Sequence, residues 1–191
     1  MNIELLKTKG RVKKFSKDEF ICMEKEAGNT AYLLLQGRAE VIFASFEDKT
    51  HRVAVLKPGA FFGEMSLLED KVRNASVQAK TDDTLVLEIE KSNFFEILQA
   101  DSTIAWNLLN TLLSRMENMM SDMRLSSYAS VAGYKKNALY LQIKKLNEEQ
   151  FAQIVLKDKE YAYKLLRFLS SALAEMNEVM IKEEKEKQLR W

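Results

Sequence analysis

Hydrophobic and polar residues follow two different patterns along this chain, and the change comes near residue 92. Before it, short apolar or alternating runs are separated by turn-forming residues, and five of the six glycines and the only proline lie in this part. Runs of this length and spacing are typical of antiparallel strands in a sandwich or roll. The predicted strands are Arg11–Phe15, Phe20–Met23, Ala31–Leu35, Arg38–Phe46, Arg52–Leu56, Ala75–Ala79 and Thr84–Ile89.

From Ser92 onward the apolar residues recur at helical spacing. A short helix is predicted from Ser92 to about Ala100. Asp101 is then expected to cap a long helix, because its carboxylate can accept hydrogen bonds from the free N–H groups of the first turn. Along that helix the apolar positions alternate between spacings of four and three, which predicts a coiled-coil seam. The seam residues are Ala105, Leu109, Leu112, Met116, Met119 and Met123.

The last third of the chain also has a helical pattern. The helices predicted there are Tyr134–Leu146, Glu148–Leu156 and Asp158–Lys187. The last of them has a seam of its own, at Ala162, Leu166, Leu169, Leu173, Met176 and Met180.

A weak internal repeat relates the two helical regions. At an offset of 56 or 57 residues, Phe95, Asp101, Trp106 and Leu112 correspond to Phe151, Asp158, Tyr163 and Leu169. Either two amphipathic helices share a pattern by chance or a helical hairpin has been duplicated, and both explanations are open.

The stretch Phe62–Val77 carries the groups best suited to bind a ligand. Gly63 permits close backbone approach or a positive φ, and Glu64 follows it at the start of a half-apolar helical turn whose free N–H groups favour an anion. Arg73 adds a planar, permanently charged fork that suits phosphate oxygens. The small residues Ala75 and Ser76 leave room beside the next strand. A sugar that carries a phosphate would use all of these groups.

These residues resemble the phosphate-binding cassette of the cyclic-nucleotide-binding domain family, in the segments Phe62-Gly63-Glu64-Met65-Ser66-Leu67-Leu68 and Arg73-Asn74-Ala75-Ser76-Val77. That family includes catabolite-activator-type regulators, regulatory subunits of protein kinase A and cyclic-nucleotide-gated channels. The resemblance covers residues 10–125 and includes Gly28-Asn29, Ala31–Val41 and Phe94–Met123. It implies an N-terminal antiparallel, jelly-roll-like β-roll followed by a long C-helix. Together with the helical pattern of the last third, this predicts an α+β fold with an all-helical C-terminal extension. The expected domains are residues 1–125 and residues 126–191, the second for dimerisation or partner docking.

The resemblance also implies a ligand, cAMP or cGMP. Glu64 would accept the ribose 2′-hydroxyl proton, Arg73 would pair with the cyclic phosphate, and backbone amides near Gly63–Ser66 and Ala75 would support that phosphate. The implied ligand-binding residues are Phe62, Gly63, Glu64, Met65, Ser66, Arg73, Asn74, Ala75 and Ser76.

The C-helix covers the purine in this family, so the candidate base caps are Met116, Met119 and Met120. Activator-type members place purine-reading hydroxyls at the positions of Met119 and Met120. Because a methionine sulfur is only a weak acceptor, the preferred base stays open.

Composition argues against several other functions. One histidine and one cysteine cannot build a usual zinc site, and no serine–histidine–acid grouping stands out, so no metal, cofactor or enzymatic activity is expected. A net charge of +1 shows no broad attraction to nucleic acid, and residues 126–191 show no recognition helix with a wing. Neither a signal peptide nor a run of about 20 apolar residues is present, so a cytoplasmic protein with no membrane contact is expected.

Three functions remain from this pattern. The first is a cyclic-nucleotide sensor that couples the cassette to a helical interface, with a homodimer formed through the helices around Ala105–Met123 and Ala162–Met180. The second is a structural or interaction module that has the same fold and binds no nucleotide. The third is a transcription regulator with an atypical DNA-binding tail, which has the least support.

Overall fold

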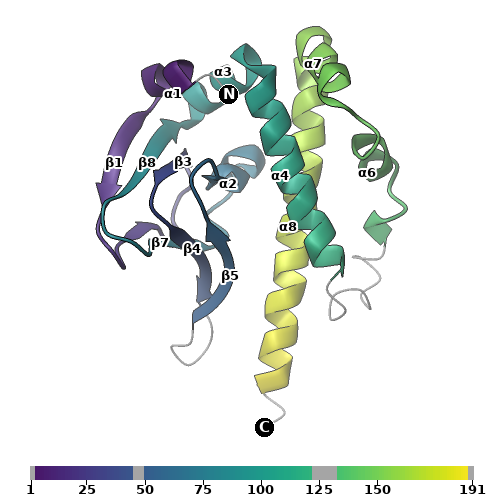
Figure 1. Ribbon diagram of the computed structural model, residues 1–191. Helices are drawn as coiled ribbons and strands as arrows, with labels where there is room; N and C mark the ends of the chain where they lie inside the picture. The colour runs from purple at the N-terminus through teal and green to yellow at the C-terminus, as the bar shows by residue number, and fades with distance from the viewer. Residues whose placement is uncertain (1–2, 45–49, 122–132, 189–191) are drawn as a thin grey trace. The chain divides into compact units, whose positions relative to one another are not determined.

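The chain divides into two compact units, residues 1–100 and residues 101–191. The computed structural model describes residues 3–44, 50–121 and 133–188 of them. The first unit is an antiparallel β-roll with short helices, and the second unit is helical (Figure 1). This architecture confirms the predicted α+β class.

Two four-stranded antiparallel sheets form the roll. Their strand orders are β1-β8-β3-β6 and β2-β7-β4-β5. The strands are β1 Arg11–Phe15, β2 Phe20–Cys22, β3 Thr30–Gln36, β4 Ala39–Ala44, β5 Thr50–Leu56, β6 Phe61–Phe62, β7 Ser76–Ala79 and β8 Thr84–Glu90. All but β6 correspond to predicted strands within a few residues; β6 is two residues long, too short for an alternating pattern to appear.

The core of the roll is built from both sheets, because alternate side chains of each strand point to the same face. Leu34 of β3 and Val86 of β8 are fully buried in it, together with Ala39 of β4 and Val77 of β7 from the other sheet. Phe62 of β6 belongs to the same cluster. The short strand β6 therefore ends in the core, directly before the predicted ligand-binding stretch.

Three helices are described in the first unit: α1 Ile3–Lys9, α2 Glu64–Glu69 and α3 Lys91–Ala100. The sequence pattern does not predict α1, which forms against α3. There Lys9 Nζ pairs with Glu96 at 2.6 Å, and Asn93 Nδ2 donates a hydrogen bond to the Lys9 carbonyl oxygen at 2.9 Å. Helix α2 is the predicted helical turn, and α3 begins one residue before its predicted start.

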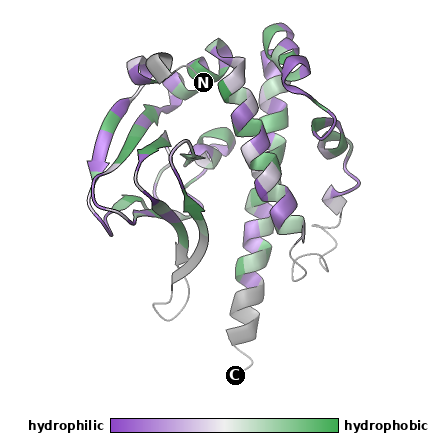
Figure 2. Cartoon of the chain, in the orientation of Figure 1, coloured by the Kyte–Doolittle hydropathy of each residue, from purple (hydrophilic) through white to green (hydrophobic). Residues whose placement is uncertain are grey.

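The described helices of the second unit are α4 Ser102–Ser121, α6 Ala138–Ile143, α7 Glu148–Lys157 and α8 Lys159–Gln188. Helix α8 packs against α4, α6 and α7. Helices α4 and α8 run in the same direction (Figure 1). Apolar and polar bands alternate along both, as amphipathic helices require (Figure 2). None of the helices described has both the length and the apolar character needed to cross a membrane.

One predicted helix, Tyr134–Leu146, is wrong in its bounds. Helix α6 begins only at Ala138, because the side chain of Asn137 caps it. The Oδ1 atom of Asn137 accepts hydrogen bonds from the N–H groups of Leu139 at 2.9 Å and Tyr140 at 3.3 Å. An asparagine that bonds to the backbone in this way starts a helix rather than continuing one.

Helix α4 belongs to the second compact unit. The sequence grouped it with the roll, as the C-helix of a domain spanning residues 1–125. That α4 acts together with the roll as its C-helix stays a prediction.

Candidate functional site

The predicted ligand-binding stretch begins where strand β6 ends and helix α2 starts. Gly63 precedes α2 in the left-handed region, at φ 72°, which residues with a side chain rarely adopt. A Cβ atom at this position would lie 2.7 Å from Arg73 Nη1 and 3.2 Å from the Tyr32 ring. A glycine is therefore needed here both for the turn and for the close approach of Arg73.

The side chain of Arg73 lies inside the protein, and the residue is 5% exposed. Its Nη1 donates hydrogen bonds to the Gly63 carbonyl oxygen and to Ser66 Oγ, both at 2.8 Å. Its Nη2 donates to Thr30 Oγ1, also at 2.8 Å. The guanidinium carbon lies 5.5 Å from the centroid of the Tyr32 ring. These contacts hold the guanidinium in one position, beside the first turn of α2.

The loop before β3 fixes the backbone around Arg73. The Arg73 N–H donates to the Glu26 carbonyl oxygen at 2.8 Å, and the Arg73 carbonyl accepts from the Lys25 N–H at 2.9 Å. Three residues later, Ser76 Oγ accepts a hydrogen bond from the Glu24 N–H at 2.9 Å. The segment that carries Arg73 into β7 is therefore tied to this loop at three points.

Arg73 has no ion-pair partner among the described residues, although the carboxylates of Glu26 and Glu64 are close enough to act, like Arg73, on the Cys22 thiol. The hydrogen-bond acceptors of Arg73 are neutral oxygens of Gly63, Ser66 and Thr30, and no carboxylate in the described ranges forms an ion pair with it. Its Nε–H and its second Nη2–H have no hydrogen-bond partner among those same residues. A buried cation is costly unless an anion accompanies it. The site is therefore electrostatically suited to an anionic ligand.

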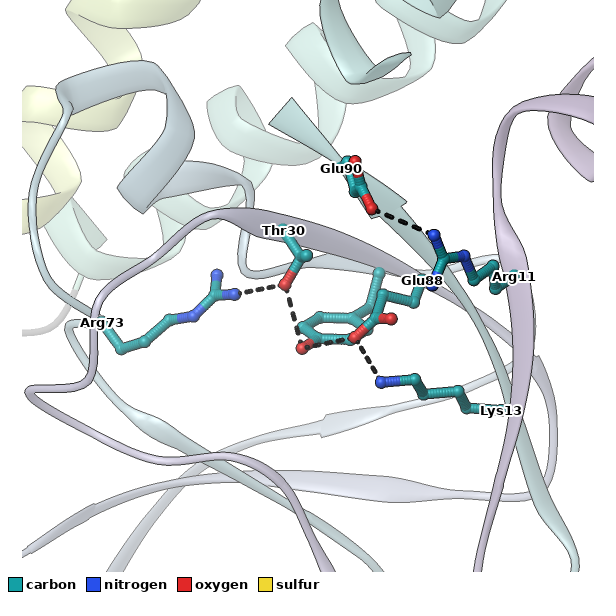
Figure 3. A network of polar contacts seen from close by, with 7 residues as sticks. Arg11, Lys13, Thr30, Arg73, Glu88 and Glu90 are labelled. Carbon is teal, nitrogen blue, oxygen red and sulfur yellow. Dashed lines mark hydrogen bonds and ion pairs between the residues drawn. The ribbon is translucent and has the colours of Figure 1, made fainter. Parts of the chain in front are cut away.

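A chain of hydrogen bonds connects Arg73 with the first sheet (Figure 3). Thr30 Oγ1, which accepts from Arg73, donates to the Tyr32 hydroxyl at 3.0 Å, and that hydroxyl makes a longer contact of 3.4 Å with Glu88 Oε1. Lys13 Nζ pairs with the same Glu88 oxygen at 2.8 Å. From Arg73 to Glu88 each group donates to the next, so each hydrogen bond polarises the following one, and Lys13 donates to Glu88 from the other side.

Two titratable groups near Arg73, the Cys22 thiol and the Tyr32 hydroxyl, carry no negative charge that could pair with it. Burial raises the pKa of the Cys22 thiol to about 11, although the nearby Arg73 acts to lower it. Burial also raises the pKa of the Tyr32 hydroxyl above its usual value, against the effects of the Thr30 hydrogen bond and of Arg73. Both groups are therefore neutral at pH 7. The described residues also contain no cluster of histidine, cysteine and acidic side chains able to hold a metal ion.

The sequence that builds this site matches a known family. Residues 12–101 match the profile described as the cyclic nucleotide-binding domain. This segment is similar to cyclic nucleotide-binding domains. The match runs from β1 through α3, so it includes α2, Arg73 and the loop before β3.

Proteins that share this domain include two protein kinase components. The cAMP-dependent protein kinase regulatory subunit of Emericella nidulans is 34% identical over 119 residues, which are 62% of this chain and 24% of that protein. The cGMP-dependent protein kinase 2 of Homo sapiens is 31% identical over 84 residues, which are 44% of this chain and 11% of that protein. The chain thus spans about a quarter or less of the length of either relative.

Among solved structures, the crystal structure of the Thermus thermophilus catabolite activator protein is similar with a TM-score of 0.59. The two sequences are 22% identical, and the similarity covers 88% of this chain and 82% of that chain. At this identity the similarity concerns the fold.

The N-terminal unit brings the predicted ligand-binding residues together in two segments. Glu64 and Ser66 are buried on α2, at 1% and 4% exposed, and Ser76 is buried at the start of β7. The ring of Phe62 stacks on that of Tyr32, with 5.1 Å between centroids. The remaining predicted residues are half-buried: Gly63, Met65, Asn74 and Ala75, besides the buried Arg73. Their individual roles toward a ligand stay predictions.

The candidate base caps lie on α4, in the second unit. Met116 and Met120 are buried, at 0% and 3% exposed, and Met119 is half-buried. Their role toward a purine stays a prediction.

Sequence reasoning missed the hydrogen-bond chain that leads away from Arg73. Thr30 and Tyr32 lie on a strand, where a hydroxyl gives no pattern that reveals its partner. Glu88 lies between the apolar residues Leu87 and Ile89, and Lys13 between Val12 and Lys14, so their sequence pattern is that of ordinary exposed charged residues of a strand. The register of β3 on β8 places Tyr32 directly opposite Glu88, and only this pairing reveals the contact.

Proposed function

We propose that this protein is a non-enzymatic sensor that binds a cyclic nucleotide, cAMP or cGMP, in its N-terminal domain. The observation that carries the proposal is the buried Arg73, whose described acceptors are all neutral and which has two N–H groups without a described partner. A cyclic phosphate diester has one negative charge, and its free oxygens can accept both N–H groups. The printed names of the two relatives, a cAMP-dependent and a cGMP-dependent kinase component, support this class of ligand.

The proposed partner of the sugar is Glu64. It is the first residue of α2 and directly follows Gly63, whose carbonyl oxygen accepts from Arg73. Glu64 and Arg73 both affect the pKa of Cys22, Glu64 raising it and Arg73 lowering it, so the two charges lie near the same thiol. A carboxylate here can accept the ribose 2′-hydroxyl while the guanidinium holds the phosphate.

Ser76 is proposed to assist with the phosphate. Its oxygen accepts the Glu24 N–H, which leaves the hydroxyl hydrogen available to donate. Around it, the pocket is proposed to be lined by Phe62, Gly63, Met65, Ser66, Asn74 and Ala75.

Helix α3 is proposed to carry the signal out of the site. Its first residue, Lys91, donates its N–H to the Asn29 carbonyl oxygen at 3.0 Å, and its Nζ pairs with Asp70, which follows the last residue of α2. Helix α3 is thus joined to both elements that hold Arg73: the loop before Thr30 and α2. A ligand that favours one arrangement of α2 will therefore favour one arrangement of α3. Helix α4 follows after a single residue.

The second unit is proposed to pass this signal to a partner protein. The homodimer expected from the sequence depends on two exposed apolar seams. In this chain the described seam residues from Ala105 to Met116 and from Ala162 to Met176 are buried. We therefore propose that the partner protein binds a different surface of the helical unit.

Calorimetric titration of the full chain tests the proposal. We expect binding of cAMP, cGMP or both, with one nucleotide per chain and a Kd below the millimolar range. The acyclic 5′-AMP is the control, and we expect much weaker binding because its phosphate is not closed onto the ribose. If neither cyclic nucleotide binds at millimolar concentration, the sensor proposal is wrong and the structural module takes its place.

Thr30 is expected to position Arg73 for the ligand. Thr30→Val keeps the shape but removes the oxygen that accepts from Arg73 Nη2 and donates to Tyr32. The loss of a hydrogen bond to a charged group, worth about 1.5–3 kcal/mol, predicts roughly tenfold weaker binding. Thr30→Ser keeps the hydroxyl, so we expect its affinity to stay within about twofold of the original. If Thr30→Val and Thr30→Ser bind the nucleotide equally well in the same titration, Thr30 does not position Arg73 for the ligand.

A further inference from the structure

The helix pairs α3–α4 and α7–α8 have the same construction. Helices α3 and α7 are each ten residues long, and a single residue separates each from the long helix that follows. Their starts, Lys91 and Glu148, lie 57 residues apart, as do the starts of the long helices, Ser102 and Lys159. One offset therefore relates both bounds of the short helices and the starts of the long helices, whereas the long helices differ in length, at 20 and 30 residues.

The joint between short and long helix is also repeated. In the first pair, Asp101 Oδ1 accepts hydrogen bonds from the N–H groups of Thr103 at 2.9 Å and Ile104 at 3.3 Å. In the second pair, Asp158 Oδ1 accepts from the N–H of Tyr161 at 2.9 Å. Tyr161 stands 57 residues after Ile104. The same side chain thus bonds to the same position of the helix in both pairs.

Burial follows the same offset at seven positions, but not at others, among them Ile104 with Tyr161 and Arg115 with Ala172. Phe94 and Phe151 are 1% and 0% exposed, and Leu98 and Val155 are 2% and 4% exposed. In the structure, the residue of the first helix pair that corresponds to Phe151 is therefore Phe94, whereas the sequence pattern suggested Phe95. On the long helices the buried pairs are Ala105 with Ala162, Leu108 with Leu165, Leu109 with Leu166, Leu112 with Leu169, and Met116 with Leu173. The shared helix starts, the aspartate caps and the seven buried pairs together favour duplication over chance similarity of two amphipathic helices.

The two long helices pack on one another within a single chain. Helices α4 and α8 are in contact and run in the same direction (Figure 1). The paired seam residues are at most 5% exposed. A seam of this spacing ordinarily buries itself against the same seam of another helix. Here the second seam is supplied by the same chain.

We propose that α7–α8 is a duplicate of α3–α4, and that α8 occupies the surface of α4 that a second copy of the chain would otherwise take. The protein is then a monomer that contains an internal, pseudo-symmetric helix pair. Among the described residues, the seam positions from Ala105 to Met116 and from Ala162 to Met176 are then not available to join two chains. This inference does not depend on the ligand of the N-terminal domain.

Sedimentation of the unmodified full chain gives the first test. We expect one species of 22.1 kDa at every concentration up to the high micromolar range. A species of twice this mass would overturn the proposal. No nucleotide enters the measurement, so its outcome is separate from that of the calorimetric titration.

Cysteine pairs test the pairing of the seams directly. In a Cys22→Ala chain, Leu112→Cys and Leu169→Cys stand at equivalent positions of the two helices. The proposed pairing of the seams would bring their Cα atoms within the roughly 4.4–6.8 Å that a disulfide spans. Mild oxidation is expected to join them within one chain. The control replaces Leu169→Cys with Met176→Cys, which lies about 10 Å further along α8 and should not be joined.

A chain with Leu112→Cys alone distinguishes the two arrangements. A symmetric homodimer through α4 would bring the two copies of this cysteine together and link two chains. The internal pair keeps them apart, and we expect no linked dimer. A disulfide between chains in this variant, or none within the chain carrying both Leu112→Cys and Leu169→Cys, would refute the proposal. If that double variant fails to fold, sedimentation of the unmodified chain still tests whether the protein is a monomer or a dimer.

Discussion

Arg73→Ala is expected to weaken the binding of cyclic nucleotide by about a hundredfold or more, because it removes two charge-assisted hydrogen bonds worth about 1.5–3 kcal/mol each. Arg73 is 5% exposed and has only neutral acceptors among the described residues. Its charge is therefore largely unscreened by water, and the ligand's phosphate is the group proposed to balance it. Calorimetric titration against the unmodified chain measures the change.

Arg73→Lys is the matched control for geometry. Lysine keeps the charge but lacks the planar fork, so it cannot reach Gly63, Ser66 and Thr30 and bind a phosphate at the same time. We expect an affinity between those of the unmodified and alanine chains. Circular dichroism and thermal melting must show that both variants fold. A folded Arg73→Ala chain with unchanged affinity would contradict the proposed role of Arg73.

Gly63→Ala is expected to damage the site through the backbone and through Arg73 together. At φ 72° a side chain adds strain of about 1 kcal/mol or more, and the new Cβ would lie 2.7 Å from Arg73 Nη1. The guanidinium must then leave the Gly63 carbonyl and Ser66. We expect lower stability in urea unfolding and, by loss of at least one hydrogen bond to a charged group, roughly tenfold weaker nucleotide binding.

Gly59→Ala separates these two effects. Gly59 also has a positive φ, 92°, but a Cβ there would meet no atom within 4 Å. This variant should therefore lose about 1 kcal/mol of stability through strain, with unchanged affinity. If both glycine variants keep full affinity, the close approach of Arg73 to Gly63 has no part in binding.

The strands of the roll could be predicted because each is a short run bounded by turn residues, as at Lys57-Pro58-Gly59. Helix α1 could not, because its seven residues gain stability from contacts with α3, such as Lys9 with Glu96, rather than from a pattern of their own. The bounds of α6 depend on whether the Asn137 side chain turns back to the backbone, and periodicity does not record that choice.

The cassette could be located from sequence because its groups are close together in the chain, from Phe62 to Ser76. The partners of Arg73 were harder to predict, since Thr30 is 43 residues away and is brought near only by strand pairing. The two seams posed a different problem. Heptad spacing shows that an apolar stripe will be buried, but does not show whether its partner is another chain or a later helix of the same one.

A crystal structure of the full chain with its tightest-binding cyclic nucleotide would test the central claim most directly. We predict phosphate oxygens about 2.7–2.9 Å from the free N–H groups of Arg73, with the ribose hydroxyl on Glu64. A nucleotide bound elsewhere, or an Arg73 paired with a carboxylate of the protein itself, would contradict the account.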